Sequence, residues 1–356
     1  MDYGEALRLL RDYRREHPKD IMGLNYLAVT LLYQEMNRWG ILEKLLFGQT
    51  QAVTKGRKPK ISESFRQEFL EVIASAQQVS RDRIAENPDD WEAQYWLGVN
   101  RATFGSYRYA LQKSYLGALG EAKASRKLHE KLVKRDPAFI DAQLVPGAHE
   151  YIAGSLPWYI RMVSSLAGYS GNKKQGLRMV EEVSRRGKLA REDARFVLVL
   201  FYGREKRHRE RLALLQELAK SHPRNYLVLL GLANTREILG DSEGALEAYE
   251  TLLDLRKREN SSSRPLPISR TFYQAGLLKA KMGRSEEALS DFEVASNGGS
   301  ATDFYALLAE LAAAGIYEQQ NRVKEAIEKY EKVRAASPRS KEGQLARKAL
   351  RRLKRW

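Results

Sequence analysis

One short phrase occurs five times in the C-terminal half of the chain: a turn residue, four mostly polar residues, a small residue and an apolar residue. The small-residue slot falls at positions 176, 211, 245, 288 and 326, which gives spacings of 35, 34, 43 and 38 residues. A period of about 34 residues is typical of helix–turn–helix units that stack into a solenoid. The chain is therefore expected to be all-α.

The five copies share an internal order. The slot is filled by Gly176, Arg211, Ala245, Ala288 and Ala326, and a bulky residue follows one helical turn later: Val180, Leu215, Tyr249, Phe292 and Tyr330. In two copies a proline then closes the unit, at Pro223 and Pro338. Because two helices approach closely only where a small side chain lies at their crossing, the alanines predict tight crossings, while Gly176 and Arg211 mark less regular copies.

This arrangement resembles the tetratricopeptide repeat, whose first helix carries a W-x2-L-G-x2-Y-like core and whose second helix carries A-x3-F. First-helix matches are Trp96-Leu97-Gly98, Leu232-Ala233 and Ala275-Gly276. The resemblance implies a right-handed α-solenoid of stacked antiparallel helix pairs. The stretch from Leu156 to Leu177 is also similar to bacterial-type repeat proteins of unassigned role.

A single solenoid over residues 1–356 is expected, because a solenoid grows by stacking and needs no domain break. Irregular or degenerate repeats are predicted over 1–156, regular repeats over 157–338, and a capping helix over 339–356, where Leu345, Ala346, Ala349, Leu350, Leu353 and Trp356 recur at helical spacing. Within the irregular part the patterns predict one long helix over 106–135, and either Asp89 or Asp90 as the cap of a helix that begins at Trp91.

The first residues resemble the second helix of a repeat, with Pro18 twelve residues after Ala6. Either an upstream segment such as a signal peptide is missing, or this helix is an unpaired cap, and both interpretations stay open. No stretch reaches the run of about 20 apolar residues that a membrane-spanning helix needs. We expect a soluble protein, cytoplasmic as sequenced, or periplasmic or exported if a signal peptide precedes it.

The sequence nominates no catalytic, cofactor-binding or metal-binding residues. The absence of cysteine excludes disulfides, thiol catalysis and cysteine-based metal sites, and the five histidines do not stand in a metal-binding helical frame. Nucleotide-binding glycine loops are also missing. A non-enzymatic protein–protein interaction scaffold is the leading hypothesis, with a protein or peptide as partner.

In the tetratricopeptide family the concave groove is lined by the second, fifth, ninth and twelfth positions of each first helix. The resemblance implies that a partner segment binds there, against Trp158, Arg161, Phe196, Leu200, Leu227, Leu230, Asn234, Tyr273 and Leu277, with Asp193 at the second position beside Phe196. The alternative is that the register is off by one residue and these side chains belong to the core.

The formal net charge of +16 supports a second hypothesis. Basic clusters occur at 55–60, 126–135, 185–188, 204–211 and 339–355. A field of this size attracts polyanions, so the chain could be a basic solenoid that binds RNA or an anionic membrane surface. The clusters lack interleaved aromatic residues on which bases would stack, and this favours the scaffold hypothesis.

Overall fold

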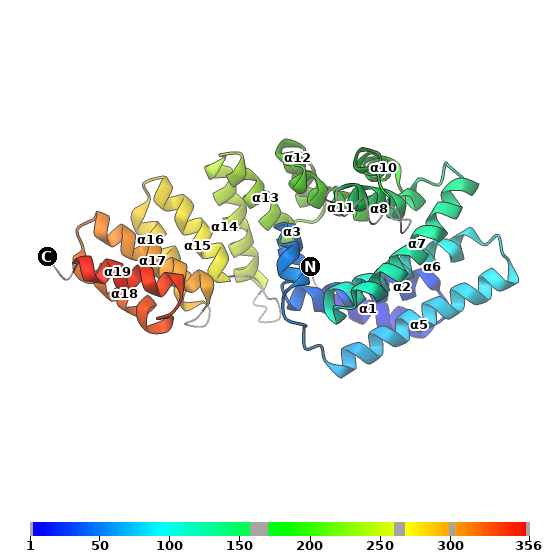
Figure 1. The fold of residues 1–356 in the computed structure, drawn as a ribbon, viewed down its shortest axis with the longest axis horizontal. Coiled ribbons are helices and arrows are strands. Elements are labelled where there is room, and N and C mark those ends of the chain that lie inside the picture. Colours follow the sequence, from blue (N-terminus) through cyan, green and yellow to red (C-terminus); the bar gives the residue numbers. More distant parts are fainter. Residues whose placement is uncertain (1–2, 157–169, 260–267, 299–302, 354–356) are drawn as a thin grey trace. The chain divides into compact units, whose positions relative to one another are not determined.

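The computed structural model describes residues 3–156, 170–259, 268–298 and 303–353 (Figure 1). All regular secondary structure in these ranges is helical, which confirms the predicted all-α class. The elements are α1 (Tyr3–Glu16), α2 (Ile21–Arg38), α3 (Ile41–Leu46), α4 (Thr50–Thr54), α5 (Glu63–Glu86), α6 (Trp91–Tyr107), η1 (Arg108–Gln112), α7 (Tyr115–Arg135), η2 (Ile140–Gln143), α8 (Leu144–Gly154), α10 (Lys173–Arg186), α11 (Arg191–Arg204), α12 (His208–Ser221), α13 (Tyr226–Ile238), α14 (Ser242–Glu259), α15 (Ile268–Lys281), α16 (Ser285–Asn297), α17 (Phe304–Gln319), α18 (Val323–Ala336) and α19 (Lys341–Leu353).

The chain divides into two compact units, residues 1–214 (unit 1) and 215–356 (unit 2). Within each unit consecutive helices pack in pairs, such as α6 with α7 and α8 with α10 in unit 1, and α13 with α14 and α15 with α16 in unit 2. Stacked helix pairs of this kind are the predicted solenoid architecture. The right-handed sense and the predicted division at 157 and 339 stay predictions.

The repeat register read from the sequence agrees with the packing. Ala245, Ala288 and Ala326 are fully buried. The bulky residues one turn later are all buried as well: Val180, Leu215, Tyr249, Phe292 and Tyr330. Each alanine lies in the second helix of its pair. Because its side chain is fully buried, a larger side chain at that position would overpack the helix crossing.

Gly176 fills its slot by letting two backbones meet. A Cβ added to Gly176 would lie 2.3 Å from the backbone nitrogen of Tyr151 on α8, closer than any real carbon contact. The ring of Tyr151 stacks on Phe201 of α11 with centroids 3.7 Å apart. This crossing therefore has no room for even a methyl group at position 176, and glycine takes the place of the alanine found in other copies.

Arg211 solves the same problem in the opposite way. Its side chain is buried, 3% exposed, and the small residue of the crossing is Gly203 on the first helix, where an added Cβ would lie 3.3 Å from Arg211 Nε. The guanidinium reaches past α11, and Nη2 donates to the carbonyl of Leu46 at the end of α3, 3.2 Å away. Since α3 also contacts α11, unit 1 closes on itself between residues 165 positions apart.

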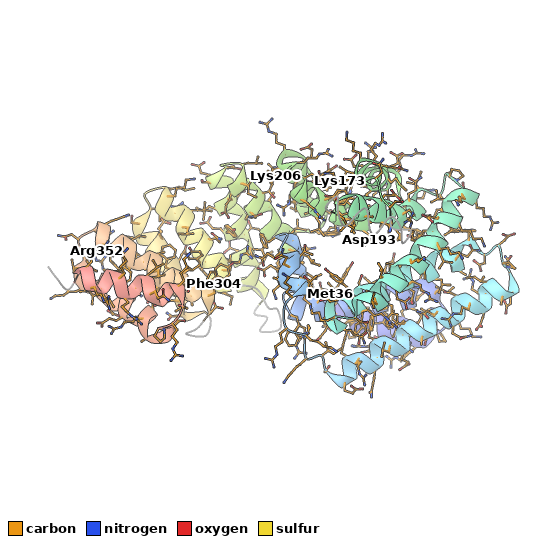
Figure 2. All side chains as sticks on the ribbon, in the orientation of Figure 1. Met36, Lys173, Asp193, Lys206, Phe304 and Arg352 are labelled. Carbon is orange, nitrogen blue, oxygen red and sulfur yellow. The ribbon has the colours of Figure 1, made fainter. Side chains whose placement is uncertain are left out.

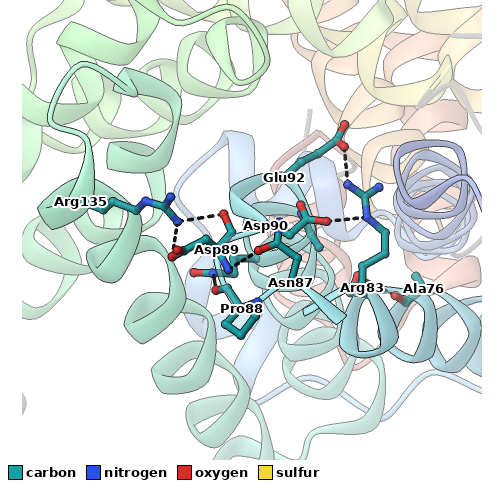
Figure 3. A network of polar contacts seen from close by, with 11 residues as sticks. Ala76, Arg83, Asn87, Pro88, Asp89, Asp90, Glu92 and Arg135 are labelled. Atoms are coloured by element: carbon teal, nitrogen blue, oxygen red, sulfur yellow. Dashed lines mark hydrogen bonds and ion pairs between the residues drawn. The ribbon is translucent and has the colours of Figure 1, made fainter. Parts of the chain in front are cut away.

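The connection between α5 and α6 shows how a repeat boundary is fixed (Figure 3). Asp90, rather than Asp89, caps α6 by accepting from the Ala93 amide at 2.9 Å. Arg83 of α5 holds the cap in place with Nε 2.7 Å from the Asp90 carboxylate. Asp89 instead accepts from Arg135 of α7 at 2.8 Å, so the two aspartates tie the turn to two different helices.

The long helix predicted over 106–135 is wrong, because the structure divides it. After Tyr107 the chain makes one π-helical turn over Arg108–Gln112, and α7 begins only at Tyr115. Lys113 takes a left-handed conformation, φ 59°, which no helix can continue, and its ammonium group donates to the carbonyl of Val53. The break thus coincides with a tether to α4.

This break hid a further copy of the second-helix pattern. Ser125 and His129 on α7 are buried in the same relation as Ala288 and Phe292 on α16. A Cβ on Gly98 would lie 2.3 Å from His129 Cε1, as a Cβ on Gly276 would lie 2.6 Å from Phe292 Cε1. Burial lowers the pKa of His129 to about 4, and its Nδ1–H donates to the Ser125 carbonyl, so the imidazole is held neutral in the core.

At the C-terminus α19 packs on α18 through buried Ala346 and Leu350. Leu345 was expected on the same face, but it is exposed, because it lies about 100° round the helix from Ala346. Trp356 lies outside the described residues.

Candidate partner-binding surfaces

The predicted groove residues fall in both units. Phe196 and Leu200 lie on α11 of unit 1, whereas Leu227, Leu230, Asn234, Tyr273 and Leu277 lie on α13 and α15 of unit 2. Trp158 and Arg161 lie outside the described residues. The surfaces of the two units are therefore considered separately.

The exposure of these side chains varies along the predicted register. Leu200 and Leu277 are each 37% exposed, and Phe196, Leu227, Asn234 and Tyr273 are half-buried. Leu230 is 1% exposed and belongs to the interior, contrary to its expected place in an open groove. The repeat position alone could not predict the burial of Leu230, because the side chain at the fifth position is covered on α13 but only half-buried on α15, at Tyr273.

An aromatic surface covers the start of two adjacent first helices of unit 2, which contact each other directly. Tyr273 on α15 lies 5.9 Å from Tyr305 on α17 and 6.1 Å from Phe292, ring centroid to centroid. Phe304 packs edge-on against Tyr305 at 5.3 Å and is 55% exposed, at the amino end of α17 (Figure 2). We call Tyr273, Leu277, Phe304 and Tyr305 the α15–α17 aromatic face.

The sequence argument missed Phe304 and Tyr305. Both residues precede the repeat register, because α17 starts one turn earlier than the spacing from Ala326 implies. The available signal was Asp303, whose carboxylate accepts from the amides of Tyr305 and Ala306 as the cap of α17. An aspartate followed by two aromatic residues marks a helix start with its rings on the first turn.

A buried arginine underlies this face. The guanidinium carbon of Arg270 lies 5.6 Å from the Tyr305 ring centroid, and the residue is about nine-tenths buried. Its positive charge acts on Glu237 of α13, whose carboxylate accepts from the Tyr249 hydroxyl at 2.5 Å. Burial raises the pKa of Glu237 despite these favourable partners.

The last repeat contains the same arrangement. Glu318 accepts from the Tyr330 hydroxyl at 2.5 Å and pairs with Arg352 on α19. Each set joins the two helices of one repeat to the helix that follows them. The first set joins α13, α14 and α15, and the second joins α17, α18 and α19. We call Glu237–Tyr249–Arg270 and Glu318–Tyr330–Arg352 the Glu–Tyr–Arg joints of unit 2.

In the described part of the chain, no three or more histidine, aspartate or glutamate side chains are grouped so that they could hold a metal ion. The same ranges contain no helix that is long and apolar enough to cross a membrane. The features that the described residues of unit 2 do form are the α15–α17 aromatic face and the two Glu–Tyr–Arg joints.

Comparison with known proteins matches one segment of the chain to a family. Residues 207–262, which begin just before α12 and run past α14, match the family model described as Tetratricopeptide repeat. The chain carries tetratricopeptide repeats. The match contains the Arg211 and Ala245 copies of the repeated phrase, and the helix pairs before and after it continue the tetratricopeptide-type pairing. No curated protein matches the sequence.

Three solved structures similar to this tetratricopeptide-repeat chain are distant in sequence. Yeast Tom70 is 14% identical over 99% of this chain and 85% of its own, with a TM-score of 0.40. The Cut9–Hcn1 structure of the APC/C is 15% identical over 96% of this chain and 58% of its own, with a TM-score of 0.41. YrrB, described as having an unusual peptide-binding site, is 15% identical over 76% of this chain and 97% of its own, with a TM-score of 0.32.

Proposed function

We propose that this chain is a non-enzymatic scaffold that binds a peptide or protein segment on its first-helix faces. Tetratricopeptide repeats support a protein-interaction role. The observation that carries the proposal is the α15–α17 aromatic face, where Phe304 is more than half exposed beside half-buried Tyr273 and Tyr305. Neighbouring exposed aromatic side chains are typical of surfaces that bind a partner segment.

The charges of the chain favour this function over polyanion binding. Several cations in the basic clusters are already neutralised by neighbouring carboxylates: Arg126 lies 2.5 Å from Glu130, Arg186 2.7 Å from Glu182, and Arg207 3.0 Å from Glu181. A paired arginine has less free charge to offer a phosphate backbone. The number of lysine and arginine residues in these clusters therefore overstates the free positive charge that a polyanion would meet there.

The test is capture of partner proteins from an extract of the organism that makes the chain, with the chain immobilised. The double variant Tyr273→Ala, Phe304→Ala should lose most of the captured protein, since aromatic anchors carry much of such binding energy. The matched control is Val294→Ala, which removes an exposed apolar side chain from the second helix α16. Capture should persist as salt is raised, because burial of apolar surface is not screened.

Equal capture by the double variant and by wild type would refute the α15–α17 aromatic face as the binding surface. Loss of all capture at raised ionic strength would instead favour the electrostatic hypothesis.

A further inference from the structure

The closure of unit 1 brings the first helices α2 and α11 to facing sides of the unit. The Arg211–Leu46 hydrogen bond and the contact of α3 with α11 hold the two ends of the unit together. Figure 2 shows Asp193 of α11 and Met36 of α2 on facing sides of the unit. The charge of Asp193 acts on the hydroxyl groups of Tyr26 and Tyr33, although all the elements from α3 to α10 lie between the two helices in sequence.

On the α2 side, Tyr26 and Tyr33 are 44% and 39% exposed. Tyr26 is fixed by an edge contact with Trp96 of α6, with ring centroids 5.6 Å apart. Burial nevertheless raises the pKa of both hydroxyls, to about 12 for Tyr33. Each of these side chains is therefore reached by solvent on one part and packed against protein on another.

On the α11 side, Asp193 stands out among the carboxylates. It is exposed, and within the described ranges it has neither a hydrogen bond nor an ion pair, whereas neighbouring Glu192 lies 2.9 Å from Arg195. Desolvation raises the pKa of Asp193, and the charge of Glu192 raises it further. A chain with a net charge of +16 has cations to spare, yet none of those described lies against this carboxylate.

We propose that this inner face of unit 1, formed by Tyr26, Tyr33 and Asp193, binds a lysine or arginine side chain of a partner segment. A cation placed there meets two partly exposed tyrosine rings and a carboxylate that pairs with none of the described residues, and both interactions are strongest in a partly desolvated site. The inference rests on the proposed scaffold function and names the chemistry of one of its partner segments.

Arginine fits better than lysine. Its planar guanidinium can stack on a tyrosine ring while two N–H groups donate to one carboxylate, and it is less strongly hydrated than an ammonium group. An acidic or phosphorylated segment is excluded from this face, because its charge would lie against the unpaired Asp193. The face thus selects by the sign of charge, and the selection is opposite to what the net charge of the chain suggests.

The experiment is selection of random peptides displayed on phage against the full chain. We expect a family of selected peptides with a basic residue at one shared position. Replacing that residue by glutamine in the synthetic peptide should weaken binding about tenfold or more, and Asp193→Asn should cause a similar loss. Tyr33→Phe should retain binding and Tyr33→Leu should weaken it, because the ring and not the hydroxyl meets the cation.

Two controls separate binding from folding. Glu192→Gln removes a neighbouring carboxylate that is already paired with Arg195, and it should leave peptide affinity within about twofold of wild type. Asp193→Asn should keep or raise the melting temperature, because the desolvated carboxylate loses no partner.

Selected peptides that lack a shared basic residue and bind Asp193→Asn as tightly as wild type overturn the inference. If those peptides are lost instead with Tyr273→Ala, Phe304→Ala, the scaffold function stands and only the cation site is wrong. If no peptide is selected at any surface, the proposed function and the inference fail together.

Discussion

The crossing of α6 and α7 provides a sharp test of the structure, through Gly98→Ala. The new Cβ would lie 2.3 Å from Cε1 and 2.5 Å from Nδ1 of His129, which is itself fully buried and cannot move aside. Overpacking of this kind costs about 1–3 kcal/mol, while replacing glycine by alanine inside a helix returns about 1 kcal/mol. We expect a net loss of about 1 kcal/mol in the free energy of unfolding.

The decisive measurement is the same substitution in a His129→Ala background, at neutral pH and low temperature. With the imidazole gone, the methyl group has room, and Gly98→Ala should now stabilise the chain by up to about 1 kcal/mol. Urea unfolding followed by circular dichroism gives both differences. The control is Gly120→Ala, a helical glycine on α7 with no atom within 4 Å of its added Cβ, which should stabilise both backgrounds alike.

Equal effects of Gly98→Ala with and without His129 would refute the reasoning. The two side chains would then not share a crossing, and Ser125 and His129 would not be the second-helix pattern of this pair.

Three further outcomes are expected. Because burial depresses the pKa of His129 to about 4, the unfolded chain binds a proton first as pH falls below about 6.5, so stability is complete above that value and declines toward pH 4 by up to about 3 kcal/mol; His129→Gln should flatten this slope in urea titrations across that range. Ala288→Leu should cost about 1–3 kcal/mol while the exposed Ala335→Leu on α18 changes stability by no more than about 0.5 kcal/mol, and equal melting temperatures would mean that the register is wrong. Arg211→Met should speed amide hydrogen exchange in α3 and leave unit 2 unchanged, and unaltered exchange in α3 would contradict the closing role of the arginine.

The sequence predicted those parts of the fold that depend on neighbours along the chain. Ala245, Ala288 and Ala326 and their bulky partners have the burial that a repeat requires, because each phrase contains its own crossing residue. The same logic failed for Ser125 and His129, since the π-helical turn and Lys113 shift them out of the period. A pattern search that allows an insertion of several residues between the two helices would have found them.

Contacts between distant segments could not be predicted in this way. Arg211 departs from the pattern in the sequence, and its hydrogen bond to Leu46 is a contact with a distant segment that an alanine could not make. Burial of Leu230 and exposure of Phe304 likewise depend on which helices cover each face. For the predicted groove, the sequence therefore predicts which helix each residue lies on, but it does not predict how exposed each side chain is.

The Glu–Tyr–Arg joints have a consequence for how such a chain can change in length. Glutamate and tyrosine are 12 residues apart in both joints, and the arginine follows the glutamate by 33 or 34 residues. Each repeat thus supplies the glutamate of the joint with the following repeat and the arginine of the joint with the preceding repeat. A gene duplication that copies one whole repeat adds a glutamate and an arginine together. The number of repeats can therefore increase or decrease without leaving a glutamate at a repeat boundary unpaired.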